Sequence, residues 1–392
     1  MKILVLNAGS SSLKCQYFVD RISIATLLIE CIGEKHGHSK LLYQGETISK
    51  DHHIPDHEDA LKEAFTLLDQ YHILPSVNTL DAIGHRVVHG GNLFHQPIHI
   101  TPKIIEDIRS LIPLAPLHNP ANLKGIEILY AHYPYIPQVA VFDTAFHQSM
   151  PAHAYLYPLP YSWYEKFDIR RYGFHGISHS FITREAARVM GRESASLNLI
   201  TLHLGNGASA TAIRSGRSID TSMGMTPLEG LMMGTRCGDI DPAIIPYLSE
   251  HCGMDISTIE TLLNKKSGLK GICGHNDMRE VIKKADDGDA LSLLALQMYI
   301  YRIRKYIGAY AVVLGQVDAL VFTGGIGENA ARVREMVCEG LEQSIRLKID
   351  RSKNEKPSTV ARSIGHSKSH IQIWVIPTNE ELEIVMQLEN IV

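Results

Sequence analysis

Short apolar runs separated by small or polar residues dominate the first 150 residues. Lys2–Asn7 is apolar after its lysine and predicts a fully buried strand. The small-residue turn 8–12 follows it, and Leu13–Val19 predicts a second strand, so the chain opens as strand–turn–strand. The same reasoning predicts further strands at Ile22–Glu30, Leu41–Ile48, Ala82–Val88 and Gln138–Asp143, and helices at His57–Tyr71 and Lys103–Leu111.

A similar order of elements begins again near residue 197. A strand at Asn198–Leu204, a glycine turn at 205–207 and a strand at Ala208–Arg214 repeat the opening pattern. A long helix, two further strands and a final helix follow, at Ala290–Leu314, Val317–Phe322, Ile371–Ile376 and from Asn379. Two halves with the same layout predict a duplicated α/β unit, although few residues are identical between them.

Chain length also favours two domains, because 392 residues exceed what one ordinary core holds. We expect an N-terminal α/β domain over 1–150 and a C-terminal α/β domain over 151–378. The last helix, about 379–392, is expected to pack back on the first domain. The Pro- and Tyr-rich stretch 151–160 is the expected crossing point.

Composition narrows the function classes. Hydrophobic residues make up 45% and charged residues 20%, which is typical of a globular protein, and the net charge of −4 gives no basic field for nucleic acid. The apolar stretch near 307–315 is too short for a membrane span, and the apolar N-terminus is too short for a signal peptide. Six scattered cysteines without a CxxC pair favour free thiols and a cytoplasmic location.

Three small-residue turns follow buried strands, at 7–12, 205–209 and 323–329. Such turns let backbone N–H groups approach a phosphate closely, and three of them favour a nucleotide site over plain turns. Neither a P-loop nor a dinucleotide-binding fingerprint is present. At the first turn, Asn7, Ser10 and Ser12 offer oxygen ligands for phosphate or Mg²⁺ water. Lys14 either neutralises phosphate charge or faces solvent as an ordinary strand lysine.

Arg86 and Arg236 are flanked by glycines, so each guanidinium either reaches an anion or makes a structural ion pair. Asp143 ends a strand, where α/β sites lie, or it only caps a turn. His175 lies in the segment Tyr172–Gly176, between Phe174 and Gly176, and is suited to donate to a charged phosphoryl group. The i, i+4 pairs His85/His89 and His175/His179 lie in glycine-rich strand or loop contexts without acidic or cysteine partners, which disfavours zinc.

Together these segments resemble the acetokinase family over essentially the whole chain. The opening Val5–Lys14 and the closing Ile376–Leu382 match, and the most specific blocks are Arg170–His179, His203–Ala210 and Asp220–Pro242. The resemblance implies the duplicated ribonuclease H-like (sugar-kinase/Hsp70/actin) two-domain architecture with an interdomain cleft. It also implies Mg²⁺-dependent, reversible in-line transfer of the ATP γ-phosphoryl group to acetate, giving acetyl phosphate and ADP.

The resemblance assigns roles to residues by motif. The catalytic set is Asp143, His175 and Arg236. Arg86 would bind the carboxylate, and the apolar acetyl pocket would consist of Val88, Leu117, Phe174 and Pro227. Mg²⁺, with Mn²⁺ as an alternative, would be held by Asn7 and Glu380, the latter also well placed for the dipole of the last helix. ATP would contact Lys14, Ser10, Ser12, His203, Leu204, Gly205, Asn206, Gly207, Asp277, Met278, Arg279, Gly325, Ile326, Gly327, Glu328 and Asn329.

Rival functions remain within and outside this class. A propionate or butyrate kinase is the nearest, and a non-catalytic nucleotide-binding sensor is the alternative from a different class. A sugar kinase fits less well, because a hydroxyl nucleophile needs a base and two arginines suit an anion better. Family members form homodimers through the second domain, so we expect one here. The stretch Gly271–Asp277 departs from the family pattern, which leaves nucleotide preference open.

Overall fold

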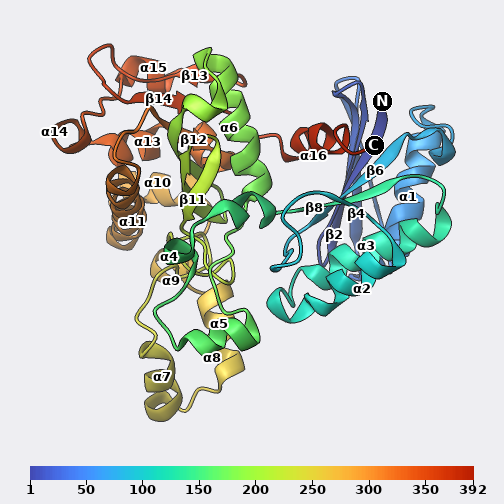
Figure 1. Ribbon diagram of the computed structural model, residues 1–392, viewed down its shortest axis with the longest axis horizontal. Helices are drawn as coiled ribbons and strands as arrows, with labels where there is room; N and C mark the ends of the chain where they lie inside the picture. The colour runs from blue at the N-terminus through green and yellow to red at the C-terminus, as the bar shows by residue number, and fades with distance from the viewer. The chain divides into compact units, whose positions relative to one another are not determined.

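The computed structural model describes all residues from Met1 to Val392. It divides into two compact units, each with its own sheet (Figure 1). Unit 1 comprises Met1–Phe146 and Asn379–Val392, and unit 2 comprises His147–Thr378. The chain therefore passes between the units twice, at Phe146–His147 and at Thr378–Asn379.

Unit 1 is built on an eight-stranded sheet with the order β5-β4-β3-β2-β1-β6-β8-β7. The predicted strand–turn–strand opening is confirmed, because β1 and β2 pair antiparallel with Ala8 opposite Leu13. On its other side β1 pairs parallel with β6, which pairs parallel with β8. The strands are β1 Lys2–Ala8, β2 Ser12–Val19, β3 Ile22–Glu30, β4 Gly37–Tyr43, β5 Glu46–His52, β6 Ala82–Val87, β7 Ile98–His99 and β8 Gln138–Phe142.

One expected strand of unit 1 is wrong. Leu41–Ile48 is not continuous: it spans the turn of the β4–β5 hairpin, in which Tyr43 pairs with Glu46. Gln44 and Gly45 form this turn with φ of +51° and +83°. Positive φ at both central residues gives the twist that a two-residue hairpin needs, and the dipeptide Gln-Gly was its only local signal.

Four helices complete unit 1: α1 His57–Gln70, α2 Pro102–Ser110, α3 Asn119–His132 and α16 Glu380–Leu388. The first begins where the Asp56 carboxylate accepts from the N–H groups of Glu58 and Asp59. Helix α3 was not among the predicted elements, because its buried residues do not form one continuous apolar stripe. It lies directly on β1, since a Cβ at Gly125 would be 3.1 Å from the Leu6 side chain.

Unit 2 repeats the central topology of unit 1. Its sheet has the order β11-β10-β9-β12-β14-β13, in which β10 pairs antiparallel with β9 and β11 while β12 pairs parallel with β9 and β14. This matches β3-β2-β1-β6-β8 strand for strand, and it confirms the predicted duplication of a ribonuclease H-like unit. The strands are β9 Asn198–Leu204, β10 Ala208–Arg214, β11 Arg217–Thr221, β12 Ala319–Thr323, β13 Arg362–Ser363 and β14 Gln372–Val375.

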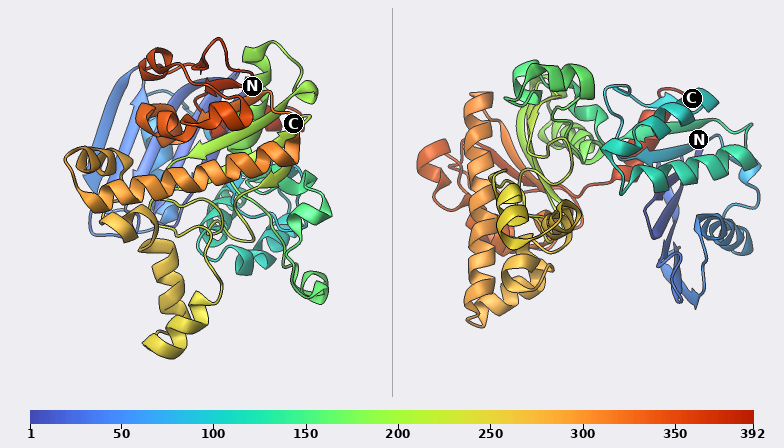
Figure 2. Two further views of the ribbon diagram at one scale, coloured as in Figure 1. Left: turned by 90° about the vertical axis from the view of Figure 1, so that its left-hand side faces the viewer. Right: turned by 90° about the horizontal axis from the view of Figure 1, so that it is seen from below.

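Helices cover both faces of the second sheet. Figure 2 shows the long α11, Ala290–Leu314, running across one face, and α6, Gly176–Met190, lies on the other. The remaining helices are α4 Ala152–Tyr155, α5 Tyr161–Phe167, α7 Ile244–Cys252, α8 Ile256–Lys265, α9 Gly268–Cys273, α10 Met278–Asp286, α12 Gly324–Asn329, α13 Ala331–Cys338, α14 Leu341–Ile345 and α15 Arg351–Glu355. No helix is both long and apolar enough to span a membrane.

The third predicted glycine turn, 323–329, is also wrong as a turn. Gly324 has a φ of +75° and redirects the chain, but the residues after it form α12. A glycine is required there, because a Cβ would come within 2.8 Å of the Leu204 carbonyl oxygen. The His175/His179 pair likewise lies at the start of α6 rather than in a loop.

Candidate active site

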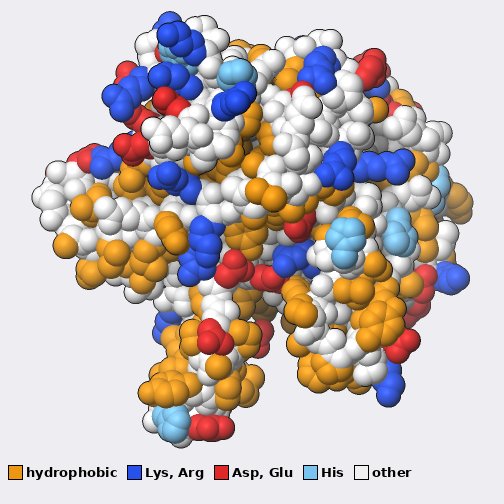
Figure 3. Space-filling view, turned by 60° about the vertical axis from the view of Figure 1, so that its left-hand side comes forward, with side chains coloured by type: hydrophobic (Ala, Val, Ile, Leu, Met, Phe, Trp, Pro, Cys, Tyr) orange, Lys and Arg blue, Asp and Glu red, His pale blue; other side chains and the backbone are white.

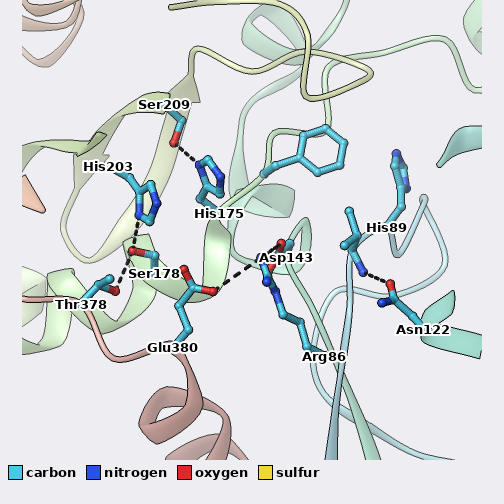
Figure 4. Close-up of polar contacts among 12 residues, drawn as sticks. Arg86, His89, Asn122, Asp143, His175, Ser178, His203, Ser209, Thr378 and Glu380 are labelled. Carbon is cyan, nitrogen blue, oxygen red and sulfur yellow. Dashed lines mark hydrogen bonds and ion pairs between the residues drawn. The ribbon is translucent and has the colours of Figure 1, made fainter. Parts of the chain in front are cut away.

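A cluster of one arginine and two carboxylates lies at one edge of the sheet in unit 1. Arg86 projects from β6, Asp143 follows the neighbouring parallel strand β8, and Glu380 is the first residue of α16. The Arg86 Nε lies 3.1 Å from Asp143 Oδ1, and its Nη2 lies 2.7 Å from Oδ2. Glu380 Oε2 lies 3.5 Å from the same Nη2 (Figure 4). Asp143 therefore holds the guanidinium through a bidentate ion pair.

Burial strengthens the interactions between the charged groups of this cluster. The Asp143 side chain is 2% exposed and that of Arg86 is 19% exposed. Burial by itself opposes the charged guanidinium, but the charges of Asp143 and Glu380 outweigh it and raise the pKa of Arg86 above its ordinary value. One cation beside two anions leaves the cluster with a formal charge of −1. It can therefore accept a further cation.

Other predicted residues of unit 1 lie on β1, on β2 and in loops of the same unit. Asn7 lies near the end of β1, the strand next to β6. Lys14 lies opposite it on β2, and its ammonium forms an ion pair with Glu381. Ser10 lies in the turn between β1 and β2, Ser12 is the first residue of β2, and Leu117 is exposed.

Two buried asparagines that the sequence analysis missed fix the chain next to Arg86. Asn122 Oδ1 accepts from the N–H of Val88, and its Nδ2 donates to the Ala8 carbonyl at 2.6 Å. Asn119 accepts from the N–H of His89 and donates to the same residue's carbonyl. Both lie on the first turn of α3. Two buried polar residues spaced i, i+3 at a helix start were the available signal.

A row of histidines and hydroxyls runs through unit 2 (Figure 4). His175 is the N-cap of α6, with a φ of +56°, and its ring stacks on that of His203 with 4.2 Å between centroids. His175 Nδ1 lies 2.9 Å from Ser209 Oγ, and His203 Nδ1 lies 2.8 Å from Ser178 Oγ. Ser178 Oγ also lies 2.8 Å from Thr378 Oγ1. A left-handed backbone at a histidine is strained, which is characteristic of functional positions.

Behind this row, two fully buried histidines stay neutral. His179 Nε2 lies 2.8 Å from the same Ser209 Oγ, and its Nδ1 lies 2.7 Å from Thr201 Oγ1. Burial lowers the pKa of His179 well below its ordinary value and that of His147 to about 4. Both ring nitrogens of His179 therefore already contact hydroxyl oxygens. No group of three or more His, Cys, Asp or Glu side chains is arranged to hold a metal ion.

Arg236 and His175 converge on the glycine turn between β9 and β10. A Cβ at Gly207 would lie 3.4 Å from His175 Nε2 and 3.6 Å from Arg236 Nη1. The Arg236 guanidinium has no carboxylate partner: Nη1 donates to the Pro227 carbonyl at 3.2 Å and contacts Met233 Sδ. Burial accordingly lowers its pKa from the ordinary value. A partly buried guanidinium without a carboxylate partner, beside a histidine and a backbone turn, is suited to bind an anion.

A cavity of about 810 Å³ lies next to this turn in unit 2. It brings together eight of the predicted ATP-binding residues with neighbours that the sequence analysis did not name, among them Asn276, Ile282 and Arg332. Its lining is Gly205, Asn206, Asn276, Asp277, Met278, Arg279, Ile282, Gly325, Ile326, Asn329, Ala330, Ala331 and Arg332. Asp277 caps α10 and pairs with Arg279, whose hydrogen bonds lower the pKa of the Asp277 carboxyl to about 2. The volume and the mixed lining suit a nucleotide.

Five predicted ATP-binding residues of unit 2 are not part of this lining: His203, Leu204, Gly207, Gly327 and Glu328. The Glu328 carboxylate makes two hydrogen bonds with backbone groups of unit 2. Its Oε1 accepts from the N–H of Gly324 at 3.0 Å and from the N–H of Thr378 at 3.1 Å. Glu328 therefore joins the start of α12 to the last residue of unit 2.

Comparison with known proteins identifies the family. The model of the acetokinase family matches residues 2–386. The chain belongs to the acetokinase family. The acetate kinase of Sulfurovum sp. (strain NBC37-1) is 60% identical over 392 residues, which cover 100% of this chain and 99% of that protein. The acetate kinase of Campylobacter fetus subsp. fetus (strain 82-40) is 49% identical, over 98% of this chain and 97% of that one.

Solved structures agree with the acetokinase assignment. A crystal structure of Porphyromonas gingivalis acetate kinase has a TM-score of 0.94 and 43% identity, and the match covers 100% of this chain and 99% of that one. A propionate kinase from Francisella tularensis subsp. tularensis SCHU S4 also has a TM-score of 0.94, with 44% identity over 100% of both chains. As an acetokinase, the chain is a phosphotransferase with a carboxyl group as acceptor, and it uses ATP and ADP.

Proposed function

We propose that this acetokinase transfers the γ-phosphoryl group of ATP reversibly to acetate, forming acetyl phosphate and ADP. The observation that carries the proposal is the Arg86 cluster: a partly buried guanidinium held by the buried Asp143 carboxylate, on a chain 60% identical to a protein named acetate kinase. Domains 1–150 and 151–378, with the last helix on the first, remain the proposed functional division.

The oxygen ligands of unit 1 suit Mg²⁺. The cluster carries a net charge of −1, and Asn7 adds an amide oxygen on the neighbouring strand. Mg²⁺ binds through a few carboxylate or carbonyl oxygens and keeps several waters, so Asn7 and Glu380 are proposed to hold it, with Asp143 beside them. When bound, the ion would neutralise phosphate charge. It would also weaken the attraction between the two carboxylates and Arg86.

The metal proposal can be tested without turnover. Titration calorimetry with Mg²⁺, in the presence of ADP, should give weaker binding for Glu380→Gln than for the unchanged protein. Glu335→Gln is a matched control, because Glu335 pairs with Arg351 at 2.6 Å in unit 2, outside both sets of groups. Equal Mg²⁺ affinity in Glu380→Gln and the unchanged protein would contradict the assignment.

The proposed mechanism needs no general base. Acetate is ionised at pH 7, since carboxyl groups have ordinary pKa values of about 4. Asp143 orients Arg86, which binds the acetate carboxylate. His175 and Arg236 stabilise the charge that develops on the transferring phosphoryl group, and the turn His203–Gly207 holds the phosphates. Lys14, Ser10 and Ser12 are the remaining proposed nucleotide contacts.

Acetate is the proposed acid, although a propionate kinase is among the similar structures. The proposed acetyl pocket consists of Val88, Leu117, Phe174 and Pro227, and Val88 narrows it relative to a smaller residue. One methylene discriminates by only about 1–3 kcal/mol, so propionate should be a poorer substrate rather than a rejected one. Comparing kcat/KM for acetate, propionate and butyrate tests this, and a lowest value for acetate would refute it.

The activity itself is tested by trapping the product. Incubation with Mg-ATP, acetate and hydroxylamine should produce acetohydroxamate from acetyl phosphate. Absence of hydroxamate, with ADP still bound at the unit 2 cavity, would refute the transferase and favour a non-catalytic nucleotide sensor. Hydroxamate with propionate or butyrate, and none with acetate, would reassign the substrate.

We further propose a cytoplasmic homodimer that associates through unit 2. Large apolar side chains are exposed on α11, namely Leu294, Tyr301 and Val312, and also on α7 and α8. Figure 3 shows hydrophobic side chains gathered on the projection that α7 and α8 form. Contiguous exposed apolar surface is typical of an interface. Light scattering should show a dimer that Tyr301→Glu converts to a monomer. The control Ile22→Glu, at an exposed site of unit 1, should leave the dimer intact. A monomeric unchanged protein would refute the dimer.

A further inference from the structure

A closed loop in unit 2 sets the position of Arg236. Residues 222–230, here called the proline loop because they include Pro227, connect β11 to the segment that leads to Arg236. The loop's ends touch: Gly230 has a φ of +104°, and a Cβ there would be 2.4 Å from the Ser222 carbonyl oxygen. The Pro227 carbonyl is the oxygen to which the Arg236 guanidinium donates. The position of that guanidinium therefore depends on the loop.

Arg171 ties the two ends of the proline loop together. Its Nη1 donates to three successive carbonyls, of Thr221 at 2.9 Å, Ser222 at 2.9 Å and Met223 at 3.0 Å. Its Nη2 donates to Glu229 Oε1 at 2.5 Å. The Arg171 side chain is 15% exposed. A planar guanidinium can donate in both directions at once from a partly desolvated position, and no other side chain reproduces that geometry.

Tyr157, from a different part of the chain, adds a second set of hydrogen bonds to the proline loop. Its hydroxyl donates to Glu229 Oε2 and accepts from the N–H of Met225 at 2.9 Å. Gly224 is enclosed between these groups, since a Cβ there would lie 1.7 Å from Glu229 Oε2 and 2.3 Å from the Tyr157 oxygen. The beginning, middle and end of the loop are thus each fixed by a polar contact.

We propose that Arg171, Glu229 and Tyr157 are positioning residues for phosphoryl transfer, which hold the proline loop so that Arg236 and Pro227 stay in place. The inference rests on the proposed function, in which Arg236 stabilises the transferring phosphoryl group and Pro227 lines the acetyl pocket. None of the three residues belongs to the lining of the nucleotide cavity. Their loss should therefore affect catalysis and acid selectivity while ADP binding stays unchanged.

The test compares Arg171→Met and Tyr157→Phe with the unchanged protein. We expect kcat to fall on the order of 10²-fold in Arg171→Met, as for loss of a transition-state donor, and about 5-fold in Tyr157→Phe, which loses hydrogen bonds without a buried charge change. The acetate-to-propionate ratio of kcat/KM should fall in both. The ADP dissociation constant should stay within about twofold. Arg188→Met is the control, because Arg188 pairs with Glu185 on the exposed side of α6.

A double variant separates positioning from a general structural role. If Arg171 acts through Arg236, adding Arg171→Met to Arg236→Ala should lower kcat by little more than Arg236→Ala alone. Additive losses of kcat would overturn the inference, as would parallel loss of ADP binding, or a Tyr157→Phe enzyme with unchanged kcat and selectivity. Absence of acetohydroxamate with the unchanged protein would refute the proposed function instead.

Discussion

Replacing Asp143 with asparagine isolates the charge that holds Arg86. The substitution keeps the shape and one acceptor oxygen of the side chain, but it removes the anion from a position that is 2% exposed. We expect kcat to fall on the order of 10²–10³-fold, because Arg86 is no longer held in the orientation that binds the acid.

The structure sets the size of the effect on stability. At an effective dielectric constant of about 20, unit charges at the 2.7 Å separation of Arg86 and Asp143 attract by roughly 6 kcal/mol. Glu380, at 3.5 Å, contributes roughly 5 kcal/mol in the same approximation and remains in the variant. Removing one partner of a buried pair costs about 3–5 kcal/mol. Since a second carboxylate stays, the unfolding free energy should fall by the lower figure, about 3 kcal/mol, or less.

Hydroxamate formation and urea denaturation measure the two effects. Asp318→Asn is a matched control, because Asp318 pairs with Arg192 at the same 2.7 Å distance, outside the residues proposed to act in catalysis. The pH dependence of kcat in Asp143→Asn should keep the shape of the unchanged protein's profile, since Asp143 carries no proton in the proposed mechanism. A kcat within threefold of the unchanged value, or a pH limb lost only in Asp143→Asn, would refute the reasoning.

Three further outcomes are expected. Arg236→Ala should lower kcat on the order of 10²–10⁴-fold, with ADP affinity unchanged in titration calorimetry because Arg236 does not line the nucleotide cavity; near-normal kcat would remove it from the mechanism. Gly234→Ala should weaken ADP binding about tenfold, because its Cβ would lie 2.0 Å from Asn206 Oδ1 and displace a cavity residue; unchanged affinity would contradict this. Burial lowers the pKa of His85 and of His147 from 6.5 to about 4, so the unfolded chain binds more protons between these values. Stability measured by urea denaturation should be complete above pH 6.5 and fall toward pH 4, by up to about 1.4 kcal/mol per pH unit per histidine, and a flat profile would contradict the assignment.

The hydrophobic pattern predicted well those elements whose apolar residues end at a clear sequence boundary. Strands β3, β9 and β10 and the helix α11 have the predicted bounds, because each begins and ends at a clear change from apolar to polar or turn residues. The β4–β5 hairpin was predicted as one strand because its turn is only two residues long, Gln44 and Gly45, and apolar residues occur on both sides of it. Helix α3 was missed because it buries asparagines and a glycine along with its apolar residues.

The candidate site was predictable in residue type but not in geometry. Motif resemblance named Arg86, Asp143 and Glu380, and the sheet topology explains why the first two meet. The pairing of Lys14 with Glu381 depends on where α16 packs, which no local pattern of the sequence encodes. The inward-facing role of Glu328 likewise follows from tertiary contacts to Gly324 and Thr378.

The segment Thr378–Glu380 has a consequence for how this chain can vary. Thr378 is fastened to Glu328 and Ser178, and only two residues later Glu380 lies beside Arg86. Asn379, between them, caps α16 by accepting from the N–H of Leu382. Every residue of this segment therefore makes a contact of its own, and substitutions that exposed loops accept should be poorly tolerated here.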